Sequence, residues 1–210
     1  RQLQEPISST YTYLLGCEDT GQAILIDPVV NAMERDLGLL QQLGLRLACT
    51  VDTHIHADHI TAALHLKQRV GSQIAAPACD RLPCADIAIE EGAPLRFGSI
   101  VLQGLHTPGH TDGHFAYLQD ARVFTGDALL IDGCGRTDFQ GGDADALYRS
   151  VNGKLFTLPP ETLVYPGHDY AGRQVSSIGQ EKARNPRLGQ GRTLQEFRAI
   201  MAGLNLPYPK

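Results

Sequence analysis

The apolar residues of this chain are confined to short runs, and Gly, Pro, Asn and Asp lie between one run and the next. The runs fall into two groups along the chain. In the first group we expect strands at 10–15, 23–26, 45–51 and 73–76 and helices at 31–43 and 60–70. In the second we expect a meander of strands at 87–89, 95–97, 100–105, 115–118 and 123–124, a strand at 162–165, and helices at 143–155, 174–184 and 193–204. Strand groups followed by helices predict a mixed α/β chain, in which two stacked sheets are covered by helices on the outside. Without a repeat or a linker, we expect one domain over residues 1–210.

Composition restricts the class of protein. The 210 residues are 42% hydrophobic and 20% charged, which is typical of a globular chain and excludes a disordered, collagen-like or coiled-coil one. The formal net charge is −5 and there is no basic run, so we expect neither nucleic acid nor a membrane as a partner. No apolar run approaches the roughly 18 to 20 residues that cross a bilayer. The first residues lack the order of a signal peptide, although a start at Arg1 leaves open that a targeting segment preceded it.

The cysteines indicate a reducing compartment. They are odd in number and widely spread, without a C-x-x-C pair: Cys17, Cys49, Cys79, Cys84 and Cys134. This argues against a disulfide scaffold and against a structural zinc ribbon. We expect each to be a small buried hydrophobe, with Cys134 singled out because it lies in a Gly-rich loop.

A dense cluster of metal-ligand types lies where an expected strand gives way to an expected helix. The segment Thr53–His59 reads H-x-H-x-D-H from His54 onward. In an extended chain His54 and His56 project to the same side, and Asp58 and His59 follow on the turn. Imidazole nitrogens and carboxylate oxygens suit zinc, iron or manganese. A polar turn with Asp58 as helix cap is the structural alternative, and it does not account for the groups described next.

Three later residues have a similar setting, because each follows an expected strand and lies beside a glycine. They are His110, Asp127 and His168. Glycine allows the sharp turn that aims such a side chain into a shared cleft at the sheet edge. For His65, His106 and His114 we expect ordinary surface or hydrogen-bonded core positions.

The H-x-H-x-D-H segment with His110, Asp127 and His168 resembles the metallo-β-lactamase superfamily over about the whole chain. This resemblance implies an αββα sandwich with a metal cleft along one edge of the sheets. Within the superfamily the chain is similar to the persulfide dioxygenases. The stretches that carry this similarity are Glu5–Tyr13, Thr53–Thr61, Thr125–Gln140, which contains GCGRTDFQ, Leu163–Tyr170 and Asn185–Arg187.

The similarity to persulfide dioxygenases implies one Fe(II) per chain, held by His54, His110 and Asp127. Two histidines and one carboxylate leave positions open for substrate and oxygen. The outer shell would then consist of His56, Asp58, His59 and His168. The implied reaction is oxidation of glutathione persulfide by O2 and water to glutathione and sulfite, as in sulfide catabolism.

Two further residues are candidates for substrate binding. Arg136 and Tyr170 lie close in sequence to Asp127 and His168, so they can reach the rim of the site and hold glutathione carboxylates or the sulfur-bearing end. The alternative for Arg136 is that it braces its own loop by pairing with Asp138 or Asp132.

Other functions stay open. All seven positions that hold two metals in the hydrolases of the superfamily are filled, so ligand counting alone favours a dinuclear zinc thioesterase such as hydroxyacylglutathione hydrolase (glyoxalase II). That enzyme carries His where Ile55 stands and has a longer helical C-terminal part. A second alternative is a non-catalytic metal-binding or sulfur-relay partner of a rhodanese-like protein.

Partners and compartment follow from the same resemblance. A rhodanese-like protein, as partner or as fusion, and a second copy of this chain are the protein partners left open; the chain end at 206–210 leaves a fragment open as well. We expect a cytoplasmic protein in a bacterium and a mitochondrial matrix protein in a eukaryote.

Overall fold

The computed structural model describes residues 1–206, and the chain divides into two compact units, residues 1–104 and 105–210. The chain end at 207–210, which the fragment hypothesis concerns, lies outside the described residues. The prediction of a single domain stays a prediction.

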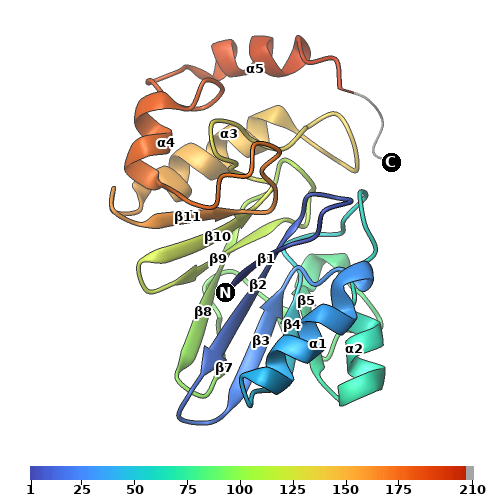
Figure 1. Ribbon diagram of the computed structural model, residues 1–210. Helices are drawn as coiled ribbons and strands as arrows, with labels where there is room; N and C mark the ends of the chain where they lie inside the picture. Colours follow the sequence, from blue (N-terminus) through green and yellow to red (C-terminus); the bar gives the residue numbers. More distant parts are fainter. Residues whose placement is uncertain (207–210) are drawn as a thin grey trace. The chain divides into compact units, whose positions relative to one another are not determined.

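The first unit is built on a six-stranded sheet in the order β1 to β6, of which β1 to β5 are labelled in Figure 1. Its strands are β1 (Gln2–Gln4), β2 (Tyr11–Cys17), β3 (Gln22–Ile26), β4 (Arg46–Val51), β5 (Gln73–Pro77) and β6 (Ile87–Ile89). The first three are antiparallel neighbours, whereas β3, β4, β5 and β6 are parallel. The unit also holds α1 (Met33–Gln42), α2 (Ala63–Val70) and the short helices η1 (Val30–Ala32) and η2 (Ala78–Asp80). It ends within β8 (Ile100–His106), which pairs antiparallel with β7 (Pro94–Phe97).

Helices α1 and α2 lie on the same side of this sheet (Figure 1). Leu40 of α1 and Leu66 of α2 pack with Leu25 and Leu47 of the parallel strands in one buried cluster. The apolar spacing of these helices therefore serves to cover the sheet. Because β3 and β4 are parallel, the residues that follow them, Asp27 and the segment 52–59, emerge at one edge.

The second unit also contains paired strands and helices. Its strands are β9 (Phe115–Gln119), β10 (Arg122–Gly126), β11 (Leu163–Pro166) and β12 (Ser176–Ser177). β10 pairs antiparallel with β9 and parallel with β11. Its helices are α3 (Ala144–Gly153), η3 (Leu155–Thr157), α4 (Ile178–Arg184) and α5 (Leu194–Ala202). The parallel pair brings the residues after β10 and β11, Asp127 and His168, to one edge.

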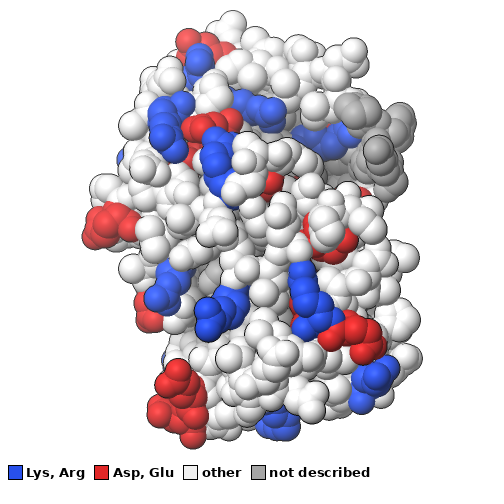
Figure 2. Space-filling view, viewed as in Figure 1, with Lys and Arg blue, Asp and Glu red and all other residues white. Residues whose placement is uncertain are grey.

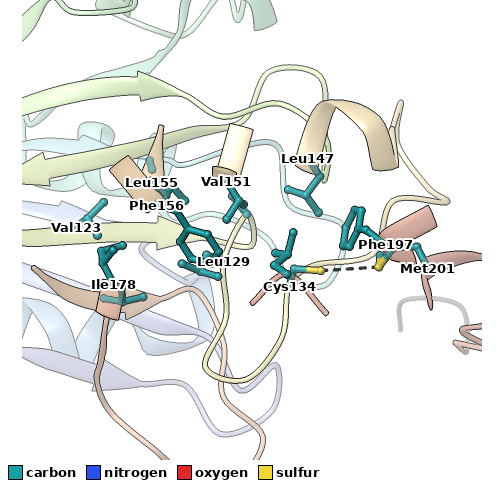
Figure 3. Packing of buried hydrophobic residues seen from close by; sticks show 14 residues of the cluster. Val123, Leu129, Cys134, Leu147, Val151, Leu155, Phe156, Ile178, Phe197 and Met201 are labelled. Carbon is teal, nitrogen blue, oxygen red and sulfur yellow. Dashed lines mark hydrogen bonds between the residues drawn. The ribbon is translucent and has the colours of Figure 1, made fainter. Parts of the chain in front are cut away.

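The core of the second unit joins its helices to its strands (Figure 3). Leu147 and Val151 of α3 are fully buried, as are Val123 of β10 and Phe197 of α5. Cys134 lies among them, with its sulfur 3.8 Å from that of Met201.

Most predicted elements are present, and the exceptions have physical causes. β1 was not expected, and it pairs with β2 through only three residues. The run 87–89 does not belong to a meander, because β6 pairs in parallel with β5. The helix expected from 174 begins at Ile178, since Ser176 and Ser177 pair with β11 and Ser177 caps α4.

All five cysteines are free, in agreement with the absence of a disulfide scaffold. Burial was expected for each and is found for Cys17, Cys49 and Cys134. It was wrong for Cys79, which is exposed, and for Cys84, which is half-buried in the turn before β6.

Within residues 1–206, every helix is too short or too polar to span a bilayer. On the face shown in Figure 2, basic and acidic side chains are interspersed and form no continuous basic patch.

Candidate metal centre

The first group of ligand candidates follows β4 in the first unit. Asp27 adopts a positive φ of 50° directly after β3, and its carboxylate accepts hydrogen bonds from the backbone N–H of Thr53 (2.7 Å) and from its hydroxyl (3.0 Å). Because the hydroxyl proton of Thr53 is used in this way, its oxygen accepts from Nδ1 of His54 at 2.9 Å. His54 therefore carries its lone pair on Nε2, the nitrogen suited to bind a metal.

His56 is held through its other ring nitrogen, Nε2. Its Nε2 donates to the Asp27 carboxylate at 3.2 Å, and its buried Nδ1 makes no hydrogen bond within residues 1–206. Burial lowers the pKa of His56, but the neighbouring carboxylates, with Asp27 foremost, raise the pKa to about 9. Carboxylates that favour a proton on this ring also favour a metal cation in its place.

Asp52, Asp58 and His59 complete the group. The ligand atoms of Asp27, Asp52 and His56 lie within 4.8 Å of one another, and so do those of His56, Asp58 and His59. Burial raises the pKa of Asp52, which accepts a hydrogen bond from Thr61. This density of carboxylates and imidazoles is the arrangement expected of a site that holds a cation.

The loop between β1 and β2 supports the same residues. Nδ1 of His59 lies 3.1 Å from the carboxylate of Asp58 and 3.2 Å from the hydroxyl of Thr10. The Thr10 hydroxyl in turn contacts that of Ser8 at 2.8 Å, which donates to the buried Glu5. The Glu5–Tyr13 stretch of the sequence thus reaches the candidate ligands.

The second group lies in the second unit and is centred on Asp127. Nε2 of His110 is 3.5 Å from one oxygen of the Asp127 carboxylate, and Nε2 of His168 is 3.6 Å from the other. Nδ1 of His110 donates to the backbone carbonyl of Arg136 at 2.8 Å. A carbonyl only accepts, so the neutral His110 ring has its lone pair on Nε2, which faces Asp127.

Two positions close to these residues leave no room for a side chain, so only glycine fits there. A Cβ on Gly135 would lie 2.7 Å from Nδ1 of His110 and 2.6 Å from the backbone oxygen of Asp127. A Cβ on Gly167 would lie 2.7 Å from the Asp127 carboxylate. The sequence predicts a sharp turn at Gly167, beside His168, and the structure adds close packing as the reason for glycine at both positions.

Two supporting residues were not singled out as functional from the sequence. Asp27 holds both Thr53 and His56, and its only sequence signal is an Asp at a strand end. His114 is fully buried; its Nε2 accepts from the backbone N–H of Asp127 and its Nδ1 lies 2.9 Å from the Thr107 hydroxyl. His114 is the hydrogen-bonded core histidine that was expected, and it also fixes the backbone of a candidate ligand.

The other two histidines also match expectation. His65 is exposed, and Nε2 of His106 donates to the backbone carbonyl of Asp112 at 3.0 Å.

The candidate substrate residues have different surroundings. Arg136 forms a bidentate pair with Asp138 at 2.7 and 2.9 Å, which is the bracing contact considered above, whereas Asp132 pairs with Arg173 and Arg184. Tyr170 is 80% exposed, and its ring lies parallel to that of His168, with ring centroids 6.0 Å apart. Their roles in substrate binding stay predictions.

The residues of both groups fit a metal ion. Nδ1 of His56, Nε2 of His59 and one oxygen of Asp127 are buried and make no hydrogen bond within the described chain, and such groups are costly unless a cation or water satisfies them. His54 and His110 have fixed tautomers with Nε2 as the ligand atom. An imidazole and carboxylate donor set of this kind suits Fe(II) or Zn(II).

Comparisons with known proteins agree with this chemistry. A family model described as the metallo-beta-lactamase superfamily matches residues 7–78 and 85–168. The mitochondrial persulfide dioxygenase of Homo sapiens is 46% identical over 218 residues, which cover 100% of this chain and 83% of the human protein.

A crystal structure of ETHE1 from Myxococcus xanthus superposes with a TM-score of 0.97 at 53% sequence identity, covering 100% of this chain and 92% of that one. A hydroxyacylglutathione hydrolase of Cereibacter sphaeroides is 36% identical over 191 residues, which cover 87% of this chain and 71% of the hydrolase. The identity to the human dioxygenase is therefore higher and extends over more of the chain.

Proposed function

The chain belongs to the metallo-β-lactamase superfamily and, within it, to the persulfide dioxygenases, and we propose that it oxidises glutathione persulfide at one Fe(II) ion. The observation that carries this is the identity to the human enzyme over the full chain, with the ligand types in place. The balanced reaction converts the persulfide, O2 and one water to glutathione, sulfite and two protons. The relatives are named for the persulfide; the glutathione carrier and the iron are our proposal.

We propose that His54, His110 and Asp127 bind the iron. The hydrogen bonds of Thr53 and of the Arg136 carbonyl support this set, because they leave Nε2 of His54 and of His110 as ligand atoms. Bound Fe(II) supplies the redox chemistry by which O2 reacts with the terminal sulfur of the persulfide.

The remaining polar groups are proposed to orient water and substrate. His168, whose Nε2 faces the Asp127 carboxylate, can hold a water molecule or a proton beside that ligand. His56, Asp58 and His59 form the corresponding group in the first unit. Arg136 and Tyr170 are proposed to hold the charged ends of glutathione.

A dinuclear zinc thioesterase is the second candidate, favoured by the presence of all seven ligand types. The lower identity to the hydroxyacylglutathione hydrolase argues against it. A non-catalytic metal-binding protein is less well supported, because relatives that are 46% identical over the whole of this chain are named as enzymes.

Compartment and partners are proposals as well. The human relative is named as mitochondrial, which supports a mitochondrial matrix location if this chain is eukaryotic; we propose a cytoplasmic one if it is bacterial. A rhodanese-like protein would supply persulfide sulfur, and we propose it as a partner alongside a homodimer.

Single substitutions test the ligand set. We expect His54→Ala, His110→Ala and Asp127→Ala each to lose both iron and activity, because the loss of one of three ligands is rarely tolerated. His56→Ala and His168→Ala should keep most of the iron and turn over more slowly. Metal analysis and oxygen uptake of anaerobically purified protein check both, and iron loss in His56→Ala equal to that in His54→Ala would contradict the assignment.

A further inference from the structure

The chain that follows Asp127 is held in place by side chains from the region of α4. This segment, residues 132–136, contains no regular strand apart from an isolated bridge between Leu130 and Gly133. Asp132 takes a positive φ of 55°, a conformation that is rare for residues with a side chain. Such a segment keeps its shape only where neighbouring groups determine it.

Polar side chains hold successive backbone groups of this segment. The carboxylate of Glu181 accepts from the N–H of Asp132 at 2.9 Å. The side-chain amide of Asn185 donates to the carbonyl of Gly133 at 3.0 Å. The guanidinium of Arg187 donates to the carbonyl of Cys134 at 2.7 Å.

These three side chains are also fixed to one another. Asn185 and Glu181 are fully buried, and the Asn185 amide donates to the Glu181 carboxylate at 2.8 Å. The Asn185 side-chain oxygen accepts from the backbone N–H of Arg187 at 3.0 Å. The side chains of Glu181, Asn185 and Arg187 therefore act together as one bracket on the segment.

The bracket ends at a metal-ligand candidate. After the Cys134 carbonyl, the N–H of Gly135 donates to the backbone oxygen of Asp127 at 2.7 Å, and the carbonyl of Arg136, one residue further on, accepts from Nδ1 of His110. The hydrogen bond to Nδ1 determines which His110 nitrogen faces Asp127 and how the ring is turned. The position of the Arg136 carbonyl therefore controls both.

We propose that Arg187 is a positioning residue of the metal centre, acting with Asn185 and Glu181 through residues 132–136 to place the Arg136 carbonyl against His110. This inference rests on the proposed function in that His110 is taken as a metal ligand. Its effect is on metal affinity and on the electronic environment of the metal.

The test compares Arg187→Met and Arg187→Lys with a matched control, Arg192→Met. Arg192 also donates to a backbone carbonyl, that of Pro186 at 2.8 Å, but it makes no hydrogen bond with residues 132–136 among those described. The measurements are the Fe(II) dissociation constant by chelator competition, the visible spectrum of the Co(II)-loaded protein, and the melting temperature of the metal-free protein.

We expect Arg187→Met to raise the Fe(II) dissociation constant about tenfold, the lower end of what loss of an outer-shell partner costs, and to shift the Co(II) spectrum. Arg187→Lys should recover most of both properties, since an ammonium group can donate to the Cys134 carbonyl. Arg192→Met should leave affinity and spectrum unchanged, whatever it does to the melting temperature.

Unchanged affinity and spectrum in Arg187→Met would overturn the inference, and so would an equal loss of affinity in Arg192→Met, which would indicate general loosening. His110→Ala distinguishes this failure from failure of the proposed function. If His110→Ala keeps its Fe(II), the ligand set itself is wrong. If His110→Ala loses Fe(II) and Arg187→Met does not, only the bracket is rejected.

Discussion

At the scale of single residues, Arg136 has two roles that one substitution can separate. Its backbone carbonyl supports His110, and its side chain pairs with Asp138. Arg136→Ala leaves the carbonyl in place and removes only the guanidinium.

If the guanidinium also holds a glutathione carboxylate, we expect Arg136→Ala to raise KM about ten- to a hundredfold, since a charge-assisted hydrogen bond contributes roughly 1.5–3 kcal/mol. Iron content should be unchanged. Kinetics, melting temperature and iron content on one preparation check this. An unchanged KM with a lowered melting temperature would show that the side chain only braces its loop. Arg136→Lys should be nearly as defective if the contact is bidentate.

The sequence predicted the residue types of the candidate site but not their orientation. The H-x-H-x-D-H spacing and the later His110, Asp127 and His168 were identified from ligand chemistry and adjacent glycines. Which nitrogen of each ring is available depends on distant partners: Asp27 for His56, and the Arg136 carbonyl for His110. Neither contact can be derived from the spacing of the histidines, because Asp27 follows a different strand and the partner of His110 is a backbone carbonyl.

At the scale of elements, Gly135 is the position where space is most restricted near Asp127. A methyl group there would lie within 3.0 Å of two Asp127 atoms and of Nδ1 of His110. We expect Gly135→Ala to lower Fe(II) affinity at least tenfold, in the range for disturbed outer-shell contacts. Gly153→Ala is the control, because a Cβ at the end of α3 meets nothing within 4 Å, and it should leave affinity unchanged. Equal affinities of the two variants would contradict this packing argument.

The loop between β1 and β2 depends on the charge of Glu5. Burial raises the pKa of this carboxyl, but hydrogen bonds from Ser8 and Ile7 outweigh burial, and the folded-state pKa lies below its usual value. A lowered pKa contributes stability above the unfolded-state pKa, and this is lost as the pH falls through the folded-state pKa.

We therefore expect Glu5→Gln to lower the free energy of unfolding by about 1–3 kcal/mol near neutral pH. The difference from the unmodified protein should shrink as the pH falls below the ordinary pKa of a glutamate, where both carry an uncharged side chain. Urea unfolding at a series of pH values checks the trend. A constant difference across the series would mean that the charge of Glu5 is not involved.

The elements themselves were largely predictable because their apolar spacing is regular. Helices α1, α3 and α5 each lie within an expected helical segment. The pairing of strands was harder to predict: β6 is only three residues long, and nothing in its sequence indicates that it pairs in parallel with β5. Short strands carry too few residues for a pattern to specify their neighbours.

At the scale of the whole molecule, family membership and the imidazole and carboxylate ligand candidates together support persulfide oxidation as the function. The identity to a persulfide dioxygenase spans the chain, whereas ligand counting alone would favour two zinc ions and a hydrolase. Family context decides between these alternatives because the same ligand types serve both chemistries.

Iron-dependent oxidation of a persulfide is tested most directly by oxygen uptake on glutathione persulfide with anaerobically purified protein of known metal content. We predict one iron per chain and one O2 consumed for each sulfite formed, with activity proportional to iron. Two zinc ions per chain, no oxygen uptake and hydrolysis of a glutathione thioester would contradict the proposed dioxygenase activity.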